Sequence, residues 1–209
     1  MKSRYNGVVK VVFDKALSTI LIFVTSPLWV LISLAILAES LLSPAGRGGL
    51  FHSEVRVSAG RPFDLYKFRI LKAGGERAIK AGAVPKAVEN DPMNSTKVGW
   101  ALKKFGLDEL PQLLNILSGR MSFVGPRPKP VAEYEAEIER GRDFRARLRA
   151  GLTGPVQVMK GTSRTEDDQV RADFAYAELL ERGTQLRILA FDIKILFKTL
   201  LVMLKATGE

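Results

Sequence analysis

The stretch ALSTILIFVTSPLWVLISLAILAESLL, from Ala16 to Leu42, decides how this chain is built. Its one charged residue is Glu39, near the end, and it exceeds the roughly 20 residues that an α-helix needs to cross a bilayer. We therefore expect a helix in contact with lipid. A cleaved signal peptide fits less well. The apolar region of a signal peptide has only about 7–15 residues and is followed by a small-residue cleavage site, whereas this segment is longer and lacks a clear site of that kind.

Ser26-Pro27 lies near the middle of this segment. Proline removes a backbone donor, crowds the preceding turn and kinks a helix. A kinked span is one outcome, because a nearby hydroxyl such as that of Ser26 can bond the freed carbonyl. A re-entrant helix with both ends on one side is the other, and the residues alone favour the span. The positive-inside rule favours neither flank, as would be expected if both ends lay on one side. Basic residues stand on both flanks, at Lys2, Arg4, Lys10, Lys15 and Arg47.

Composition narrows the chemistry that the chain can perform. Its 209 residues suit one domain with an added membrane element, and its net charge of +10 favours nucleic acid, nucleotide phosphates or acidic lipid as partners. The absence of cysteine excludes disulfides, thiolate nucleophiles and cysteine-ligated metals, and the single histidine, His52, excludes a histidine-rich site. Any metal should therefore be a hard cation such as Mg²⁺, held by carboxylate oxygens.

Beyond residue 46 the pattern indicates an α+β, mostly helical fold with a small β element. Alternating residues within 50–70 predict one or two strands, and Gly, Pro, Asn and Lys within 73–95 predict an extended loop. We expect a helix to begin at Asp108, whose carboxylate would serve as the N-cap, and to end near Ser118-Gly119. Further helical patterns cover 98–105, 131–148, 164–182 and 186–204.

The last of these helices is apolar but carries Asp192, Lys194 and Lys198. Burying these charges in a bilayer would cost several kcal/mol, whereas a helix lying in the interface keeps them wet. We favour an interfacial amphipathic helix. A helix packed against the domain is the alternative.

Asp108 and Glu109 are the main candidates for chemistry, within Gly106-Leu107-Asp108-Glu109-Leu110-Pro111-Gln112. At the start of a helix, free N–H groups and the macrodipole favour an ionised carboxylate, which could act as a nucleophile or a metal ligand. An aspartate that only caps a helix is the simpler explanation. Nearby lysines and arginines favour chemistry, because phosphoryl transfer depends on cations that position the reacting group.

Two segments offer cations for phosphate. One is Tyr66-Lys67-Phe68-Arg69, and the other is Val124-Gly125-Pro126-Arg127-Pro128. In the second, the prolines fix the backbone that presents the guanidinium of Arg127, which matches phosphate oxygens bidentately. A rigid surface turn with a solvated arginine is the alternative.

Taken together, these segments resemble the bacterial sugar transferase family, the small monotopic phosphoglycosyl transferases. The resemblance covers nearly the whole chain. It is highly specific, because five segments occur in order at plausible spacings. They are Ser26-Pro27, Tyr66-Lys67-Phe68-Arg69, Leu107-Asp108-Glu109-Leu110-Pro111-Gln112, Val124-Gly125-Pro126-Arg127-Pro128 and Gly151-Leu152-Thr153-Gly154.

The resemblance implies a re-entrant helix broken at Ser26-Pro27, which makes residues 1–45 a membrane-inserted element and 46–209 a cytosol-facing catalytic domain with interfacial helices. It places the protein in the bacterial inner membrane with its active site on the cytoplasmic face. It also implies transfer of a phosphosugar from a UDP-sugar to polyprenol (undecaprenyl) phosphate, with release of UMP. This reaction would begin the synthesis of a membrane glycoconjugate or polysaccharide.

The same resemblance assigns roles to individual residues. Asp108 would be the nucleophile, forming an aspartyl phosphosugar intermediate, and would ligate Mg²⁺, with Glu109 supporting the site. The residues expected to bind substrate are Lys67, Arg69, Lys104, Arg127, Asp173 and Tyr176, the last two from an Asp-x-x-Tyr element. Asp173 could instead only solvate a helix face.

The chain departs from the family pattern at a few positions. Glu54 stands where a glutamine is usual, and lysines replace common arginines at Lys97, Lys103 and Lys104. Lysine keeps the charge but lacks the planar fork, so we expect these changes to affect the choice of sugar more than the reaction.

The strongest rival is a non-catalytic membrane-anchored protein whose basic surface binds anionic lipid or a partner enzyme. Nucleic acid is not an expected partner, because no helix combines a basic stripe with interleaved aromatics. A homodimer is left open.

Overall fold

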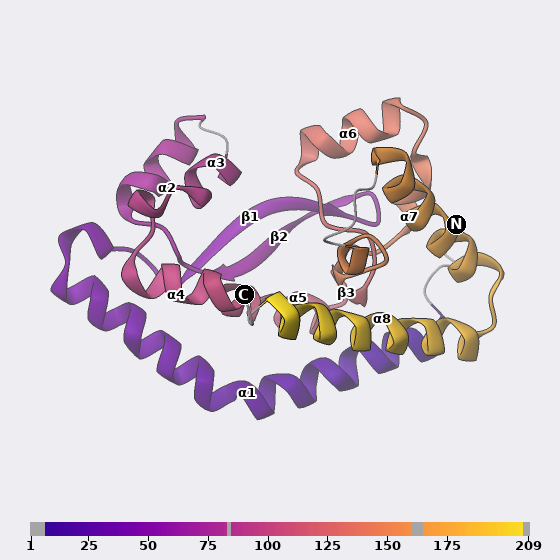
Figure 1. The fold of residues 1–209 in the computed structure, drawn as a ribbon, viewed down its shortest axis with the longest axis horizontal. Helices are drawn as coiled ribbons and strands as arrows, with labels where there is room; N and C mark the ends of the chain where they lie inside the picture. The colour runs from indigo at the N-terminus through magenta and orange to yellow at the C-terminus, as the bar shows by residue number, and fades with distance from the viewer. Residues whose placement is uncertain (1–6, 83–84, 160–164, 207–209) are drawn as a thin grey trace. The chain divides into compact units, whose positions relative to one another are not determined.

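The computed structural model describes residues 7–82, 85–159 and 165–206, and in this part of the chain it is mostly helical with two small sheets (Figure 1). The helices are α1 (Val8–Leu42), α2 (Ala73–Lys80), α3 (Pro85–Asn90), α4 (Lys97–Phe105), α5 (Gln112–Leu117), α6 (Val131–Glu139), α7 (Glu166–Arg182) and α8 (Gln185–Ala206). The strands are β1 (Phe51–Ser58), β2 (Arg61–Phe68), β3 (Ser122–Val124) and β4 (Gly151–Thr153). The prediction of a mostly helical fold with a small β element and one long apolar N-terminal helix is confirmed.

The chain folds into two compact units, which we describe separately. The first contains the chain before Leu21, Val55–Leu65 and the chain after Leu113. The second contains Leu21–Glu54 and Tyr66–Leu113. Helix α1 and the strands β1 and β2 each contribute to both units, while the predicted functional division at residue 45 stays a prediction.

Helix α1 continues through Pro27 without interruption. Proline has no N–H for the carbonyl of Phe23, four residues earlier, and the Ser26 hydroxyl donates to that oxygen at 2.7 Å instead. Thr25 makes a similar bond to the carbonyl of Leu21 at 2.6 Å. Among the described helices, α1 alone is long and apolar enough to cross a membrane by length and composition. Its re-entrant course stays a prediction.

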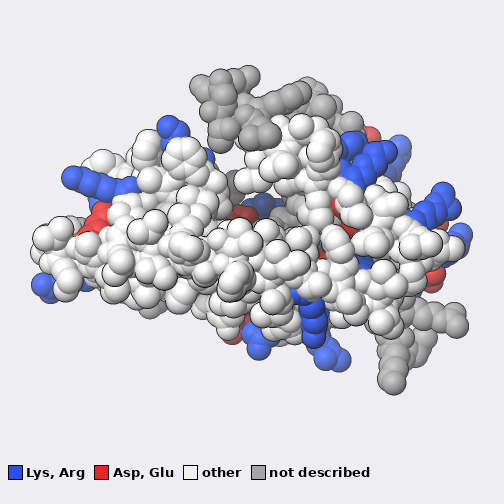
Figure 2. All heavy atoms as spheres, turned by 90° about the horizontal axis from the view of Figure 1, so that it is seen from below, with Lys and Arg blue, Asp and Glu red and all other residues white. Residues whose placement is uncertain are grey.

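The first half of α1 reverses the usual burial pattern of a soluble helix. Lys10, Asp14 and Ser18 follow one another at four-residue spacing and are all buried. Val8, Val12 and Ile20 are more than half exposed. Exposed apolar and buried polar side chains are the pattern expected of a helix that faces lipid on one side. In Figure 2 uncharged side chains cover most of the face in view, with Lys and Arg gathered toward its margins.

The second unit has a core that joins α1 to the end of β2. Ile32 and Ile36, one turn apart on α1, are buried in this core, and the Trp29 ring meets that of Phe68 edge-on at 5.4 Å between centroids. The other buried members are Ile70, Leu71, Val88 and Leu102.

The first unit contains a short parallel pair, β3 with β4, in which Ser122 lies opposite Gly151 and Val124 opposite Thr153. The chain turns immediately after β3, and a Cβ on Gly125 would lie 2.3 Å from the Arg149 carbonyl oxygen. Only glycine fits there. The Gly-Pro-Arg-Pro turn is therefore packed directly against the start of β4.

Two expectations about local structure were wrong. Residues 73–95 contain α2 and α3 in place of an extended loop, because Ala78, Ile79 and Val88 bury against the core of the second unit. Asp108 is not an N-cap: it lies inside a 3-10 turn, η3 (Leu107–Glu109), and α5 begins at Gln112. The predicted strands within 50–70 and the helix at 98–105 are confirmed.

The helical pattern at 131–148 was right in its first half, where α6 forms. The chain then leaves the α-helix at Arg140, takes a left-handed turn at Gly141 and continues as a 3-10 helix, η4 (Asp143–Arg147). The two C-terminal helices are confirmed as α7 and α8. Lys2, Arg4 and Arg164 lie outside the described residues.

Candidate active site

Asp108 and Glu109 lie on a turn that neighbouring apolar residues hold in place. Helix α4 ends at Phe105, and its C-cap Gly106 has a left-handed conformation (φ 66°) that lets the chain reverse into η3. Leu107 and Leu110, which flank the two acids, pack against the core of the second unit. The Leu-Asp-Glu-Leu sequence therefore pins the turn at both ends and fixes the carboxylates between them.

The start of α4 is tied to the apolar helix α1. The Glu39 carboxylate of α1 accepts hydrogen bonds from the backbone N–H groups of Lys97 at 2.6 Å and Val98 at 3.1 Å. Thr96 supplies the ordinary side-chain cap, accepting from the Gly99 N–H at 2.9 Å. The single acid of the apolar segment is thus a second cap on the helix that leads to Asp108.

Asp108 is almost fully buried, with 7% of its surface exposed. Burial raises the pKa of its carboxyl to about 6, and the charge of Glu109 adds to the rise, while Lys67 opposes it. The carboxyl is thus still mostly ionised at neutral pH but holds a proton more readily than a free aspartate. A buried, ionisable carboxylate of this kind is a candidate nucleophile.

Lys67, near the end of β2, is the cation whose charge opposes the rise in the pKa of Asp108. Its ammonium donates to the Glu54 carboxylate at 2.8 Å and lies 3.8 Å from that of Glu89. Burial acts to lower the pKa of Lys67, but the charges of Glu54 and Glu89 outweigh it, so the pKa lies above its ordinary value. Lys67 is charged, and it lies among carboxylates from β1, α3 and η3.

Arg69 and Lys104 occupy different surroundings. Arg69 is buried, and its guanidinium donates to the carbonyls of Gly49 at 2.7 Å and Leu71 at 3.2 Å. Lys104 is exposed on α4 and lies 5.4 Å from the centroid of the Trp100 ring. A substrate contact stays a prediction for both residues. Of the two side chains, Lys104 is the one exposed to solvent and therefore accessible to a ligand.

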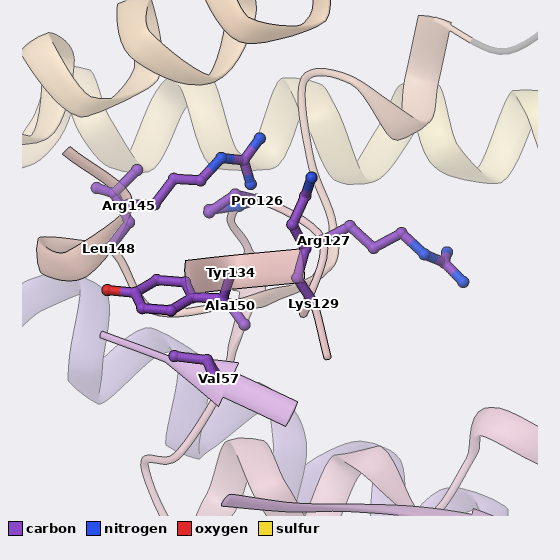
Figure 3. A pocket seen from close by; sticks show the side chains of 8 residues that line it. All are labelled: Val57, Pro126, Arg127, Lys129, Tyr134, Arg145, Leu148 and Ala150. Atoms are coloured by element: carbon purple, nitrogen blue, oxygen red, sulfur yellow. The ribbon is translucent and has the colours of Figure 1, made fainter. Parts of the chain in front are cut away.

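Arg127 belongs to the first unit, where it lines a small pocket together with Lys129, Tyr134 and Arg145 (Figure 3). Its apolar lining residues are Val57, Pro126, Leu148 and Ala150. Arg127 itself is exposed, so its guanidinium is free to meet an anion.

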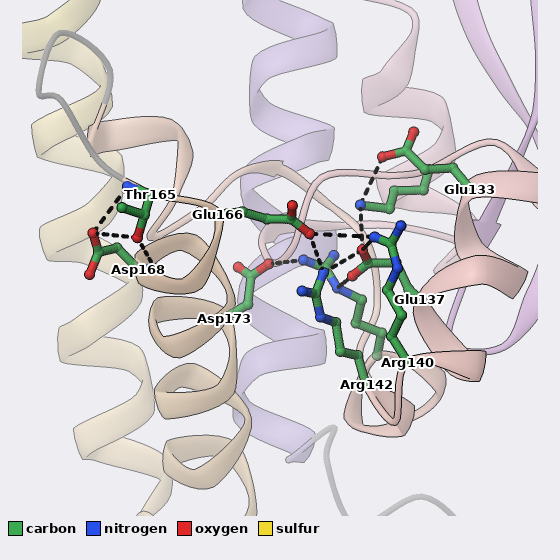
Figure 4. A network of polar contacts seen from close by, with 10 residues as sticks. Glu133, Glu137, Arg140, Arg142, Thr165, Glu166, Asp168 and Asp173 are labelled. Carbon is green, nitrogen blue, oxygen red and sulfur yellow. Dashed lines mark hydrogen bonds and ion pairs between the residues drawn. The ribbon is translucent and has the colours of Figure 1, made fainter.

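An ion-pair network braces the segments around this pocket (Figure 4). Glu137 of α6, which is buried, lies 3.3 Å from Lys129, 2.7 Å from Arg142 and 3.2 Å from Arg145. Arg145 also pairs with Asp173 of α7 at 2.5 Å. Because these charges are paired, the network fixes the backbone around Arg127 more than it offers free cations.

Asp173 and Tyr176 lie on the buried face of α7. Burial raises the pKa of Asp173 to about 6, although Arg145 opposes the rise. The Tyr176 hydroxyl bonds the Val124 carbonyl and the Asp192 carboxylate. Both side chains take part in internal contacts, and direct contact with a substrate stays a prediction for each.

The prediction that Asp192 is exposed to solvent was wrong. Asp192 is 1% exposed and pairs with Lys10 of α1, so α8 turns one charge inward. Lys194 and Lys198 are exposed, as are Ile193, Phe197 and Leu200. The helix therefore combines an inward charged contact with an exposed apolar surface, and its interfacial position stays a prediction.

Comparison with known proteins identifies the family. The bacterial sugar transferase family profile matches residues 5–206. This chain belongs to the bacterial sugar transferase family. Of the segments on which the resemblance rests, Lys67 and the Asp108-Glu109 turn lie in the second unit, and the Arg127 turn lies in the first.

Individual relatives agree with this assignment. The chain is 34% identical over 203 residues to the UDP-glucose:undecaprenyl-phosphate glucose-1-phosphate transferase of Escherichia coli, an alignment that covers 94% of this chain and 40% of that protein. It is 32% identical to the exopolysaccharide production protein ExoY of Sinorhizobium fredii, with 97% and 88% covered. A UDP-N-acetylgalactosamine-undecaprenyl-phosphate N-acetylgalactosaminephosphotransferase of Aeromonas hydrophila is 33% identical, with 77% and 37% covered.

The sequence did not single out several residues that shape the site. Glu89, a partner of Lys67, carried no local signal. No sequence pattern indicated the residues that line the pocket with Arg127, which include Lys129, Tyr134 and Arg145. Asp14 did carry one: an acid one turn after Lys10, at the edge of an apolar segment, suggests an inward-facing polar pair.

Proposed function

We propose that this chain is a phosphoglycosyl transferase that moves a phosphosugar from a UDP-sugar to undecaprenyl phosphate and releases UMP. The observation that carries the proposal is the buried Asp108 carboxylate on a turn that is tied through α4 to the apolar helix α1. The names of relatives from Escherichia coli and Aeromonas hydrophila support the two substrate classes.

The first step uses Asp108 as the nucleophile. A carboxylate oxygen attacks the phosphorus that bears the sugar, the bond from that phosphorus to the oxygen of UMP breaks, and UMP leaves with the bonding electrons. The product is an aspartyl phosphosugar. A pKa of about 6 leaves Asp108 largely ionised at neutral pH, and burial keeps water from the reacting oxygen.

In the second step an oxygen of undecaprenyl phosphate attacks the same phosphorus. The bond to Asp108 breaks, the carboxylate is regenerated, and the sugar is left on a diphosphate-linked polyprenol. Splitting the transfer lets a soluble donor and a lipid acceptor use one nucleophile in succession. We assign phosphate binding to Lys67 in the second unit and, independently, to Arg127 in the first.

The acids fit a Mg²⁺ ion that binds together with its substrate. Asp108 would hold the ion with Glu109 supporting the site, and because the charge of Glu109 adds to the pKa rise that burial causes at Asp108, a bound cation would relieve this repulsion. The described residues contain no cluster of three or more acids or histidines able to hold a metal. Mg²⁺ commonly binds through one or two carboxylates with substrate phosphates and water. When bound, it would neutralise charge on the donor diphosphate.

We propose further that α1 is re-entrant, so that the protein is monotopic with its site on the cytoplasmic face of the inner membrane. In the first unit the early part of α1 contacts β3 and α8 through Lys10, and in the second its late part contacts α4 through Glu39. Basic residues stand on both flanks of α1, with Lys15 before its apolar part and Arg47 after it, which supports two ends on the same side.

An assay of the two half-reactions tests the proposal. Purified protein in lipid nanodiscs receives Mg²⁺, undecaprenyl phosphate and a panel of UDP-sugars, and UMP is measured. Without the acceptor, we expect a burst of UMP equal to the enzyme and a phosphosugar on the peptide that contains Asp108. Asp108→Asn should lose both, whereas Asp143→Asn, a surface control in η4, should keep both. Release of UDP, or a label on another side chain, would overturn the mechanism.

A membrane-anchored binding protein without catalysis is the second candidate, favoured by the exposed apolar and basic side chains of α8. It predicts vesicle binding that is equal in the native protein and in Asp108→Asn, with no UMP from any UDP-sugar. The assay above separates the two functions.

A further inference from the structure

Four side chains from three helices meet at the backbone of β3, immediately before the Arg127 turn. They are Lys10 and Asp14 of α1, Tyr176 of α7 and Asp192 of α8, and each is at most 3% exposed. All belong to the first unit. We call these four residues the β3 clamp.

Helix α1 grips two consecutive residues of β3. The Asp14 carboxylate accepts from the Phe123 N–H at 3.2 Å, and the Lys10 ammonium donates to the Val124 carbonyl at 3.2 Å. Residues four apart lie on the same face of a helix, one turn above the other. One face of α1 therefore holds both a donor and an acceptor of the strand.

The other two members of the clamp close the contact from α7 and α8. The Tyr176 hydroxyl lies 3.1 Å from the Val124 carbonyl oxygen and 2.7 Å from a carboxylate oxygen of Asp192. The second oxygen of Asp192 pairs with Lys10 at 2.5 Å. The Val124 carbonyl thus lies between an ammonium and a phenol, and Asp192 orients both of them.

The held backbone leads directly into the turn that carries Arg127. β3 is only three residues long and pairs with β4. After Val124 the chain makes the Gly125-Pro126 turn, in which proline leaves little freedom for the backbone to adjust. A shift of Val124 would therefore be passed on to Arg127.

We propose that Lys10, Asp14, Tyr176 and Asp192 are positioning residues, which fix the Arg127 turn to α1 and α8. The inference rests on the proposed function for the role of Arg127 in binding phosphate. It gives Tyr176, buried away from solvent, a task in the reaction without contact with substrate. It also makes the geometry of the phosphate-binding turn depend on the placement of the lipid-facing helix.

Tyr176→Phe is the mildest test, because it removes one hydroxyl and keeps the ring that stacks on Phe191 at 5.5 Å between centroids. Breaking the Lys10–Asp192 pair from one side would leave a buried charge and risks loss of folding. Phe191→Leu is the matched control, since it weakens the packing of Tyr176 but leaves the five polar contacts of the clamp in place.

The decisive measurement is a double-mutant cycle with Arg127→Lys, which keeps the charge and loses the planar fork. We expect Tyr176→Phe to lower kcat/KM for the UDP-sugar by about 10-fold in the native background, as small misplacements of positioning groups do. In the Arg127→Lys background it should change kcat/KM by less than about 2-fold. Phe191→Leu should have the same effect in both backgrounds.

Hydrogen exchange in nanodiscs supplies a readout that does not depend on activity. Tyr176→Phe should speed exchange of the amides of Val124, Gly125 and Arg127 while the helices of the second unit keep their protection. Equal effects of Tyr176→Phe in both backgrounds, or unchanged exchange at these amides, would overturn the clamp. If Arg127→Lys leaves kcat/KM unchanged, the proposed role of Arg127 fails, and exchange alone then decides the clamp.

Discussion

The ammonium of Lys67 lies 2.8 Å from the Glu54 carboxylate, so the cation that should meet the donor phosphates is already paired. Both side chains are largely buried, at 12% and 11% exposure, which strengthens the pair relative to one at the surface. Glu54 is also one of the positions at which the sequence departs from the family pattern, in which a glutamine is usual. The pair therefore bears on how strongly this protein holds its donor.

Glu54→Gln should release Lys67 for the donor diphosphate. We expect KM for the UDP-sugar to fall by about 3-fold, because a charged partner that competes for the ammonium has been replaced by a neutral one. Steady-state UMP release over a range of donor concentrations measures this. Glu89→Gln is the control, and it should have a smaller effect, since its carboxylate is 3.8 Å away. A higher KM in Glu54→Gln would mean that Glu54 orients Lys67 for binding.

Asp108 should titrate with a pKa of about 6 in the metal-free protein. Burial disfavours the charged form and Glu109 adds repulsion, so the proton is held to a higher pH than in a free aspartate. Glu109→Gln removes the repulsion and should lower this pKa. Carbon-13 NMR of labelled aspartate carboxyls measures both values, and Asp108→Asn identifies the signal. A resonance that titrates near the ordinary aspartate value would contradict the burial that we describe.

The same raised pKa should appear in activity as an acidic limb. Asp108 must be ionised to attack phosphorus, so UMP release in the first half-reaction should fall as the pH drops through the pKa of the loaded enzyme. Bound Mg²⁺ stabilises the carboxylate and should place this limb below the metal-free value. Glu109→Gln should move the limb to lower pH still.

Patterns that are local in the chain predicted much of the fold. The apolar stretch before residue 42, the alternation in β1 and β2 and the helical periods of α4, α7 and α8 each reflect one element facing one environment. Helices α2 and α3 were missed because they have only eight and six residues, and their apolar side chains Ala78, Ile79 and Val88 are held by the core of the second unit. Such packing depends on segments distant in sequence.

For the candidate site, too, local sequence patterns were informative and contacts between distant segments were not. Motifs predicted Asp108, Glu109, Lys67 and Arg127 as site residues. The partners that set their environment, such as Glu89 for Lys67, come from other segments and leave no trace at a fixed spacing. Asp192 was misjudged for a related reason: a charge within an apolar helix looks solvated until its partner on α1 is known.

Removing Pro27 should change the topology of α1. Pro27→Ala restores an N–H for the Phe23 carbonyl and removes the ring that crowds the preceding turn, so a straight span becomes more stable relative to a re-entrant helix. The chain has no cysteine, which makes single-cysteine labelling clean. With cysteine at Val8 or at Ser43, both ends should react from the cytoplasmic side in the native background. In Pro27→Ala we expect a fraction of molecules with the two ends on opposite sides. Opposite sides in the native background would contradict the re-entrant course.

Glu39 should stabilise the protein through its cap on α4. Its carboxylate accepts two N–H groups at a helix N-terminus, where a negative charge also meets the positive end of the macrodipole. Glu39→Ala should therefore lower the free energy of unfolding by about 1–2 kcal/mol, or about 2–8 °C in Tm for a chain of this size. Glu39→Gln keeps an acceptor oxygen and should lose less. Thermal unfolding in nanodiscs compares the two with Glu178→Ala, an exposed acid on α7. Because α4 runs directly into the Asp108 turn, Glu39→Ala should also reduce the burst of UMP in the first half-reaction. An unchanged burst with a lowered Tm would limit Glu39 to stability.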